Sequence, residues 1–257
     1  MTTTCKNCNQ KFKGHYCSNC GQSANTKDIS MIYLWHEIEH GILHIDKGIL
    51  YTTKELFTRP GNSIKEFIDG KRVKHFQPLA YIFILSSLYA LLAHYFKIGI
   101  YHNEITTKIP NIDKQKGLEV IQMILDIFEW FRSHYAYTTI IFLPSFSLAS
   151  YLSFRKSNYN YLKHLVLNAY LAGQRTVVFI LFLPFFALIN NKQVISTLQN
   201  VETVIWLTLM VWTFFQFFGT NKLLKNIKLT LATFLYLLIQ IIIVAIILGV
   251  SIVLAFS

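Results

Sequence analysis

Residues 78–96 read PLAYIFILSSLYALLAHYF and contain no Asp, Glu, Lys or Arg. As a helix rising about 1.5 Å per residue, these nineteen residues extend about 28 Å, close to the ~30 Å hydrocarbon core of a bilayer. Aromatic residues near the ends of the run are typical of membrane interfaces. The sequence therefore predicts a transmembrane helix over 78–96.

Four further apolar runs follow this one. The predicted spans cover 135–154, 162–189, 204–219 and 230–256, and the last is long enough to tilt. Only 14% of all residues are charged, against about 25% in soluble domains, so the composition excludes an ordinary globular protein. We predict an all-α polytopic membrane protein with about five transmembrane helices in a domain over 78–257.

Basic residues are distributed unevenly between the loops. With the N-terminus in the cytosol, segments 1–77, 155–164 and 220–229 hold seventeen Lys and Arg residues, and the opposite segments, 97–134 and 190–203, hold six. Cytoplasmic loops of membrane proteins carry such an excess. The bias predicts a cytosolic N-terminus and contact with anionic lipid headgroups. It accounts for the net charge of +11 without a nucleic-acid partner, which we do not expect.

The first 28 residues carry every cysteine of the chain, as two Cys-x-x-Cys pairs. The cysteines are Cys5, Cys8, Cys17 and Cys20. This spacing is typical of a tetrahedral Zn²⁺ site with four thiolates, which would be structural because no coordination position stays open. A segment this short cannot bury a core, so the metal would order it. The alternative, four unrelated thiols, fits the paired spacing poorly. We predict a cytosolic zinc ribbon over 1–28 with one Zn²⁺.

Residues 29–77 mix apolar residues with His, Glu and Lys, a pattern that favours amphipathic helices on the membrane surface. Ser63 and Glu66 have the spacing of a capping box after Pro60 and Gly61, which predicts a helix that begins at Ser63.

Within this region, residues 36–40 read His-Glu-Ile-Glu-His. In zinc proteases two His at this spacing bind the metal and the Glu activates water. The candidate catalytic residues are His36, Glu37, His40, His44 and Asp46. A pattern with three fixed positions arises easily by chance, and Gly41 interrupts the helix that a protease would continue. We therefore favour an interfacial helix and keep a second metal site as the alternative.

A basic cluster immediately precedes the first span. Lys71, Arg72 and Lys74 are placed to contact a phosphate of a lipid headgroup. The alternative, which we favour, is that these charges only fix the topology.

The third predicted span contains three polar residues, Asn168, Gln174 and Arg175. A charge inside a membrane normally faces a partner or a water-filled cavity, so these residues are a candidate intramembrane site. By helical spacing Asn168 and Arg175 share a side, together with Tyr161 or His164. The alternative is that the span begins near Thr176 and leaves Arg175 at the interface.

Several short motifs occur in an order known from one family. They are residues 17–22 (CSNCGQ), 44–46 (HID), 59–61 (RPG), 66–72 (EFIDGKR), Pro78, 81–86 (YIFILS) and 163–165 (KHL). On these motifs the chain resembles bacterial membrane proteins catalogued as domain of unknown function 3667. The resemblance implies an inner-membrane protein with a cytosolic ribbon, and it implies no activity. Five crossings from a cytosolic N-terminus would place the C-terminus in the periplasm.

Three functions are compatible with these features. The first is a non-enzymatic, homo-oligomeric assembly, either channel-like or lipid-contacting, whose ribbon meets a cytosolic protein partner. The second is a membrane-embedded metal enzyme that uses the His36 cluster on a lipid-linked or peptide substrate. The third is a scaffold or regulator that acts through the ribbon. We favour the first because the polar residues of the spans are sparse.

Overall fold

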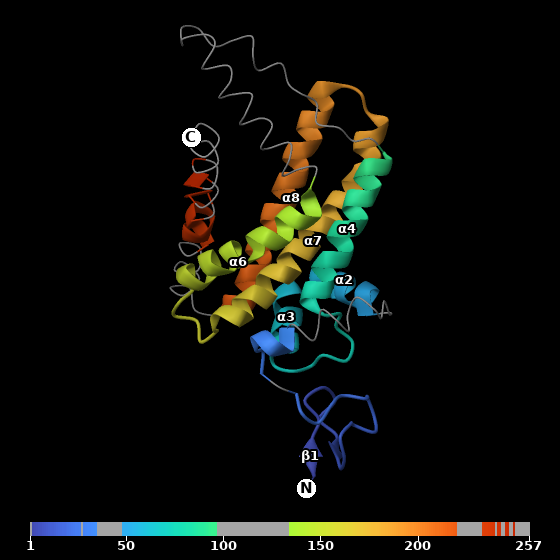
Figure 1. Cartoon of the computed structure of the whole chain (residues 1–257), viewed down its shortest axis with the longest axis vertical. Helices are drawn as coiled ribbons and strands as arrows, with labels where there is room; N and C mark the ends of the chain where they lie inside the picture. The colour runs from blue at the N-terminus through green and yellow to red at the C-terminus, as the bar shows by residue number, and fades with distance from the viewer. Residues whose placement is uncertain are drawn as a thin grey trace.

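The computed structural model describes residues 2–26, 28–34, 48–96, 134–219, 233–239, 241–242, 245–246 and 249 (Figure 1). This part of the chain is mostly helical. Two short strands, β1 (Thr3–Thr4) and β2 (Lys11–Phe12), are antiparallel, with Thr3 opposite Phe12. The helices are α2 (Gly48–Thr58), α3 (Pro60–Ile68), α4 (Pro78–Tyr95), α6 (Tyr135–Ser153), α7 (Tyr161–Leu188) and α8 (Lys192–Phe218).

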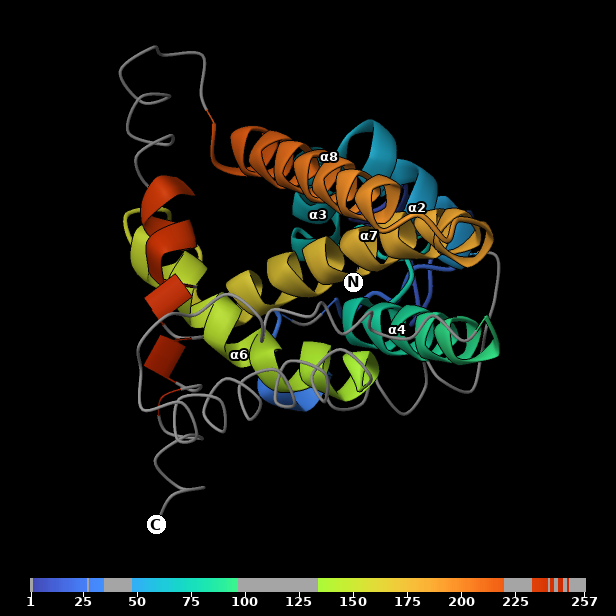
Figure 2. The same cartoon turned by 90° about the horizontal axis from the view of Figure 1, so that it is seen from above.

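Helix α7 is the centre of the bundle. It contacts α2, α3, α4, α6 and α8. Figure 2 shows α8 on one side of α7, with α4 and α6 on the other. The contact between α4 and α7 is close at Gly173, because a Cβ there would overlap the ring of the fully buried Tyr81.

Three of the described helices, α4, α7 and α8, are long and apolar enough to cross a membrane. Helices α4 and α7 agree with the predicted spans 78–96 and 162–189 to within one residue at each end. Helix α6 covers the predicted span 135–154, but it is not among these three. Helix α6 contains six Ser and Thr residues. Of the predicted span 230–256, only residues 233–239 and five later ones are described.

The helix that contains the fourth predicted span, 204–219, is longer than that span. Helix α8 begins at Lys192 rather than at residue 204. The Asn191 side chain accepts hydrogen bonds from the backbone N–H groups of Gln193 and Val194, an N-cap that starts the helix in its polar part. A search for uncharged runs finds the apolar portion of such a helix and misses its polar beginning.

The predicted start of the interfacial helix was also wrong. Helix α3 begins at Pro60, whose fixed φ suits the first helical position, and Ser63 lies inside the helix. Ser63 shares a hydrogen bond with His75, and Glu66 binds Arg59 and Lys71, so no capping box forms.

Helix α3 packs against the C-terminal end of α8. A Cβ at Gly61 would lie 2.5 Å from the Cβ of Gln216, so only glycine permits this approach. The Gly61 N–H donates to Gln216 Oε1 (3.1 Å), and Lys65 Nζ donates to the Gln216 carbonyl (2.8 Å). Lys65 thereby places a cation at the negative end of the α8 dipole. These contacts fix the segment before α4 to the base of the bundle.

Candidate metal centre and its junction with the helices

The N-terminal segment consists of two equivalent turns, one for each cysteine pair. In the first, the Cys5 N–H donates to the Gln10 carbonyl (2.9 Å) and the Asn9 N–H donates to the Cys5 carbonyl (2.9 Å). In the second, Cys17 and Gln22 are joined in the same way (2.8 Å), as are Gly21 and Cys17 (2.8 Å). The chain thus repeats one turn after twelve residues.

Each turn closes with a residue of positive φ directly after its second cysteine. These residues are Asn9 (φ 60°) and Gly21 (φ 76°). Glycine and asparagine are the residues that adopt this region most readily, so the sequence CxNCNQ/CxNCGQ encodes the reversal of the chain.

The four thiols converge on one point. Cys5 Sγ lies 3.5 Å from Cys20 Sγ, and Cys8 Sγ lies 3.6 Å from Cys17 Sγ. All four sulfur atoms lie within 4.8 Å of one another. Four Zn–S bonds of about 2.3 Å in a tetrahedron would place the sulfur atoms about 3.8 Å apart. The donor set and its spacing therefore fit a metal ion held by four thiolates.

Hydrogen bonds from the turns favour the ionised form of the second cysteine of each pair. The backbone N–H of Gln10, followed by the Asn19 side chain, lowers the pKa of Cys8 to about 6. The corresponding N–H of Gln22 lowers the pKa of Cys20. Burial raises the pKa of Cys5 to about 11. A bound cation would offset that burial penalty, because a coordinated thiol loses its proton.

The four-cysteine segment rests on the loop that follows α3. Gln22 Oε1 accepts a hydrogen bond from the Arg72 backbone N–H (3.3 Å). Gly70, with φ +105°, lies against the segment so closely that a Cβ there would be 2.9 Å from Lys6 Cδ and 3.3 Å from Thr26 Cγ2. The four-cysteine segment is therefore in direct contact with the loop between α3 and α4.

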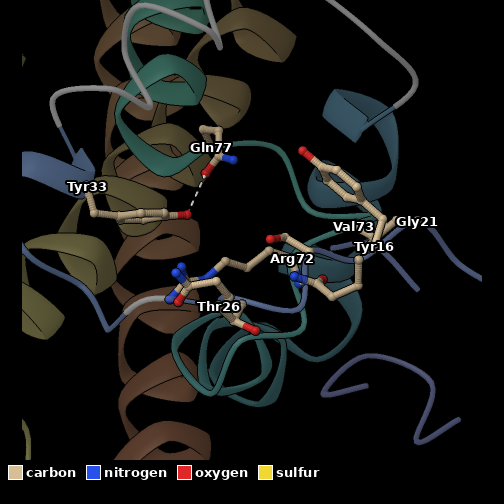
Figure 3. Close-up of a pocket in the computed structure, with 10 residues that line it drawn as sticks. Tyr16, Gly21, Thr26, Tyr33, Arg72, Val73 and Gln77 are labelled. Carbon is tan, nitrogen blue, oxygen red and sulfur yellow. Dashed lines mark hydrogen bonds between the residues drawn. The ribbon is translucent and has the colours of Figure 1, made fainter. Parts of the chain in front are cut away.

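The basic cluster before α4 is not one site. Lys71 Nζ pairs with Glu66 (3.4 Å), and Lys74 Nζ lies over the Tyr51 ring (5.9 Å). Arg72 points instead toward the four-cysteine segment, into a pocket of about 420 Å³ (Figure 3). Residues 16–26 supply one wall, and Tyr33 and residues 72–77 supply the others.

Arg72 itself is nearly enclosed, with 9% of its surface exposed. Its Nε donates to the Phe67 carbonyl (3.1 Å), and its guanidinium lies over the rings of Tyr33 (4.4 Å) and Phe67 (5.3 Å). Sequence reasoning included Arg72 in the cluster but missed Tyr33 and Gln22, because no spacing along the chain connects them to it.

The three polar residues of α7 have separate surroundings. Gln174 Nε2 donates to the carbonyl of Leu56 (2.5 Å), one of the last carbonyls of α2 that no helical N–H can reach. Arg175 lies in the middle of α7, where its guanidinium is over the rings of Phe179 (4.8 Å) and Trp206 (4.6 Å).

Asn168 belongs to a different, buried cluster. Its Nδ2 donates to Ser150 Oγ (2.7 Å), and its Oδ1 accepts from the Tyr236 hydroxyl (3.2 Å). Ser150 also shares a hydrogen bond with His164 Nδ1 (3.0 Å). The expected association of Asn168 with His164 is thus present, whereas Arg175 is not part of it. The i, i+4 spacing of His164 and Asn168 is the sequence signal for this cluster.

The candidate protease motif lies outside the described residues. His36, Glu37, His40, His44 and Asp46 all fall in the segment 35–47.

Residues 46–90 match the family model for a protein of unknown function, DUF3667. The match confirms the resemblance over these residues. No curated protein and no solved structure matches the chain.

The DUF3667 segment (residues 46–90) includes α2, α3, the loop with Arg72 and most of α4. It therefore includes the helical side of the junction, with Gly61, Gly70 and Arg72, whereas the four cysteines lie outside it. Within the described residues, the segment includes both the loop that contacts the four-cysteine segment and most of the first candidate span.

Proposed function

We propose that this chain is an integral protein of the bacterial inner membrane that forms a non-enzymatic, lipid-contacting assembly with a zinc ribbon fixed to its cytosolic face. The observation that carries the proposal is the contact of the four-cysteine segment, through Gln22 and Arg72, with the loop that leads directly into α4. The N-terminus is cytosolic in this proposal and the C-terminus periplasmic, in agreement with the charge bias.

Zn²⁺ is the metal that the four-thiolate set favours. Thiolates are soft ligands, and tetrahedral sites with four sulfur atoms are typical of Zn²⁺ or iron–sulfur centres. Two Cys-x-x-Cys turns of this size are the structural zinc arrangement. A reducing cytosol would keep the thiols available for the metal.

The surroundings of α7 favour lipid contact over conduction. Gln174 and Asn168 use their amides to join helices of the same chain, which favours a structural role for both over lining a path. The exposed residues of α8 include Val201, Val204, Ile205 and Val211, a surface suited to lipid or to a second copy. We propose a homo-oligomer on this basis, and a cytosolic protein partner at the ribbon.

Native mass spectrometry of the gently solubilised protein tests the proposal, because it reports metal and subunit number together. We expect one zinc per chain in a defined oligomer. Cys17→Ser should lose the zinc. Ser18→Ala, an exposed change between the ligands Cys17 and Cys20, should retain it.

Other stoichiometries would contradict parts of the proposal. Absence of zinc from the purified protein would contradict the proposed zinc ribbon. A second metal per chain that disappears in His40→Ala would replace the proposal with the membrane-embedded metal enzyme.

A further inference from the structure

The pocket between the four-cysteine segment and the helices contains a buried positive charge without a counter-ion. Among the described residues that line it, Arg72 is the one with a charge. No ion pair among the described residues includes Arg72, and Glu66 of helix α3 is bound by Arg59 and Lys71. A buried charge is normally paired, so the pocket favours an anion.

The two Nη groups of Arg72 are the atoms suited to bind an anion. Its Nε is used by the Phe67 carbonyl, and the rings of Tyr33 and Phe67 hold the guanidinium plane. The two Nη groups make no hydrogen bond to the described residues, and Figure 3 shows the side chain reaching toward Tyr33 and Thr26. A guanidinium with two free N–H groups on one edge matches a phosphate in a bidentate arrangement.

The rest of the lining combines polar side chains with Val73 and the rings of Tyr16 and Tyr33. Ser23, Asn25, Thr26 and Gln77 contribute hydroxyl and amide groups. At about 420 Å³ the pocket is in the size range of small-molecule sites.

The position of the pocket indicates the depth at which its ligand lies. Gln77 lines the pocket, accepts a hydrogen bond from the Tyr33 hydroxyl (3.5 Å) and is the N-cap of α4. The next residue, Pro78, begins a candidate membrane span. A group in the pocket would thus be at the level of phospholipid headgroups.

We propose that this pocket binds the phosphate group of a phospholipid headgroup or of a soluble phosphate ester, with Arg72 as its anion-binding residue. The lipid source rests on the proposed membrane embedding, whereas the phosphate chemistry does not.

Three probes separate the sources: dioctanoyl phosphatidylglycerol, dioctanoylglycerol without phosphate, and free glycerol 3-phosphate. Each is titrated against the full chain in detergent, with binding followed by thermal shift and by native mass spectrometry. Binding of phosphatidylglycerol but not of dioctanoylglycerol supports the proposal with a lipid source. Equal binding of glycerol 3-phosphate supports it with a soluble source. Binding of none of the phosphates, or of dioctanoylglycerol as tightly as phosphatidylglycerol, overturns it.

Two variants assign the binding to Arg72. Arg72→Gln should weaken phosphate binding by about tenfold or more, the effect of losing a charge-assisted hydrogen bond. Asn25→Asp, an exposed and nearly isosteric change, places a carboxylate in the pocket and should weaken binding with the fold intact. Arg155→Gln removes an exposed arginine between α6 and α7 and is the matched control.

The same samples separate this inference from the proposed function. Unchanged affinity in both Arg72→Gln and Asn25→Asp, or an equal loss in Arg155→Gln, overturns the phosphate site. Zinc content and sedimentation with membranes, measured in parallel, test the proposed function independently.

Discussion

His75 lies in the loop between α3 and α4 with 7% of its surface exposed. It shares a hydrogen bond of 2.9 Å with Ser63 Oγ and has edge contacts with the rings of Tyr51 and Phe67. Burial lowers the pKa of His75 below its ordinary value of 6.5. The folded protein therefore holds this imidazole neutral at pH values where the unfolded chain protonates it.

This difference predicts a loss of stability in mild acid. Because the unfolded chain binds the additional proton, the contribution of His75 is complete above pH 6.5 and declines as the pH falls toward the lower folded-state pKa. Melting temperatures of wild type and His75→Asn, measured from about pH 7.5 to about 5.5, should converge as the pH falls. Equal slopes for wild type and His75→Asn would disprove the assignment.

At the scale of elements, two glycines set how closely helices approach. Gly61 brings α3 onto α8, and Gly173 brings α4 onto α7. Gly249 is a helical glycine at which an added Cβ would meet nothing within 4 Å, so it provides a control for the intrinsic preference of alanine in a helix.

Gly61→Ala should destabilise the chain, because the new methyl would meet backbone atoms of α8 that cannot move aside as a flexible side chain would. Overpacking of this kind costs about 1–3 kcal/mol. Gly249→Ala should be neutral or stabilising. The comparison needs only thermal unfolding in detergent, and a Gly61→Ala protein as stable as wild type would contradict the close contact.

Gln174 joins the C-terminal end of α2 to α7 through a hydrogen bond to the Leu56 carbonyl. Gln174→Ala leaves the Leu56 carbonyl without its donor, and an unsatisfied buried group costs about 1–3 kcal/mol. We expect a lower melting temperature and faster proteolysis near the end of α2. Gln193→Ala, an exposed change in α8, should show neither effect; similar losses in both variants would argue against a specific contact.

Whether the first residue of a helix was predictable from the sequence depended on the signals at its N-terminus. The start of α7 was predictable because the apolar pattern coincides with an N-cap, Asn160, whose side chain accepts from the Lys163 N–H. The start of α3 was not, because Pro60 and Ser63 both offer plausible signals and only tertiary contacts decide between them. The four-cysteine centre was predictable from spacing alone. The pocket at Arg72 was not, because the residues that line it, from Tyr16 to Gln77, lie up to 61 positions apart in the chain.

For the whole molecule, the arrangement of the cysteines permits a direct test of orientation. All four cysteines of the chain lie in the first twenty residues. After removal of the metal by a chelator, a membrane-impermeant maleimide should label the chain in inverted inner-membrane vesicles and leave it unlabelled in intact spheroplasts. Labelling before chelation should be slow, because metal-bound thiolates are protected. Labelling in spheroplasts alone would reverse the proposed topology.

The contacts of Gly61 with Gln216 and of Leu56 with Gln174 join residues 155 and 118 positions apart. At about 5–20 residues per second, a ribosome needs about 8–31 s to reach Gln216 after Gly61. During this interval α2 and α3 have left the ribosome without the surfaces that will hold them. The contacts of α2 with α7 and of α3 with α8 therefore form late in biosynthesis.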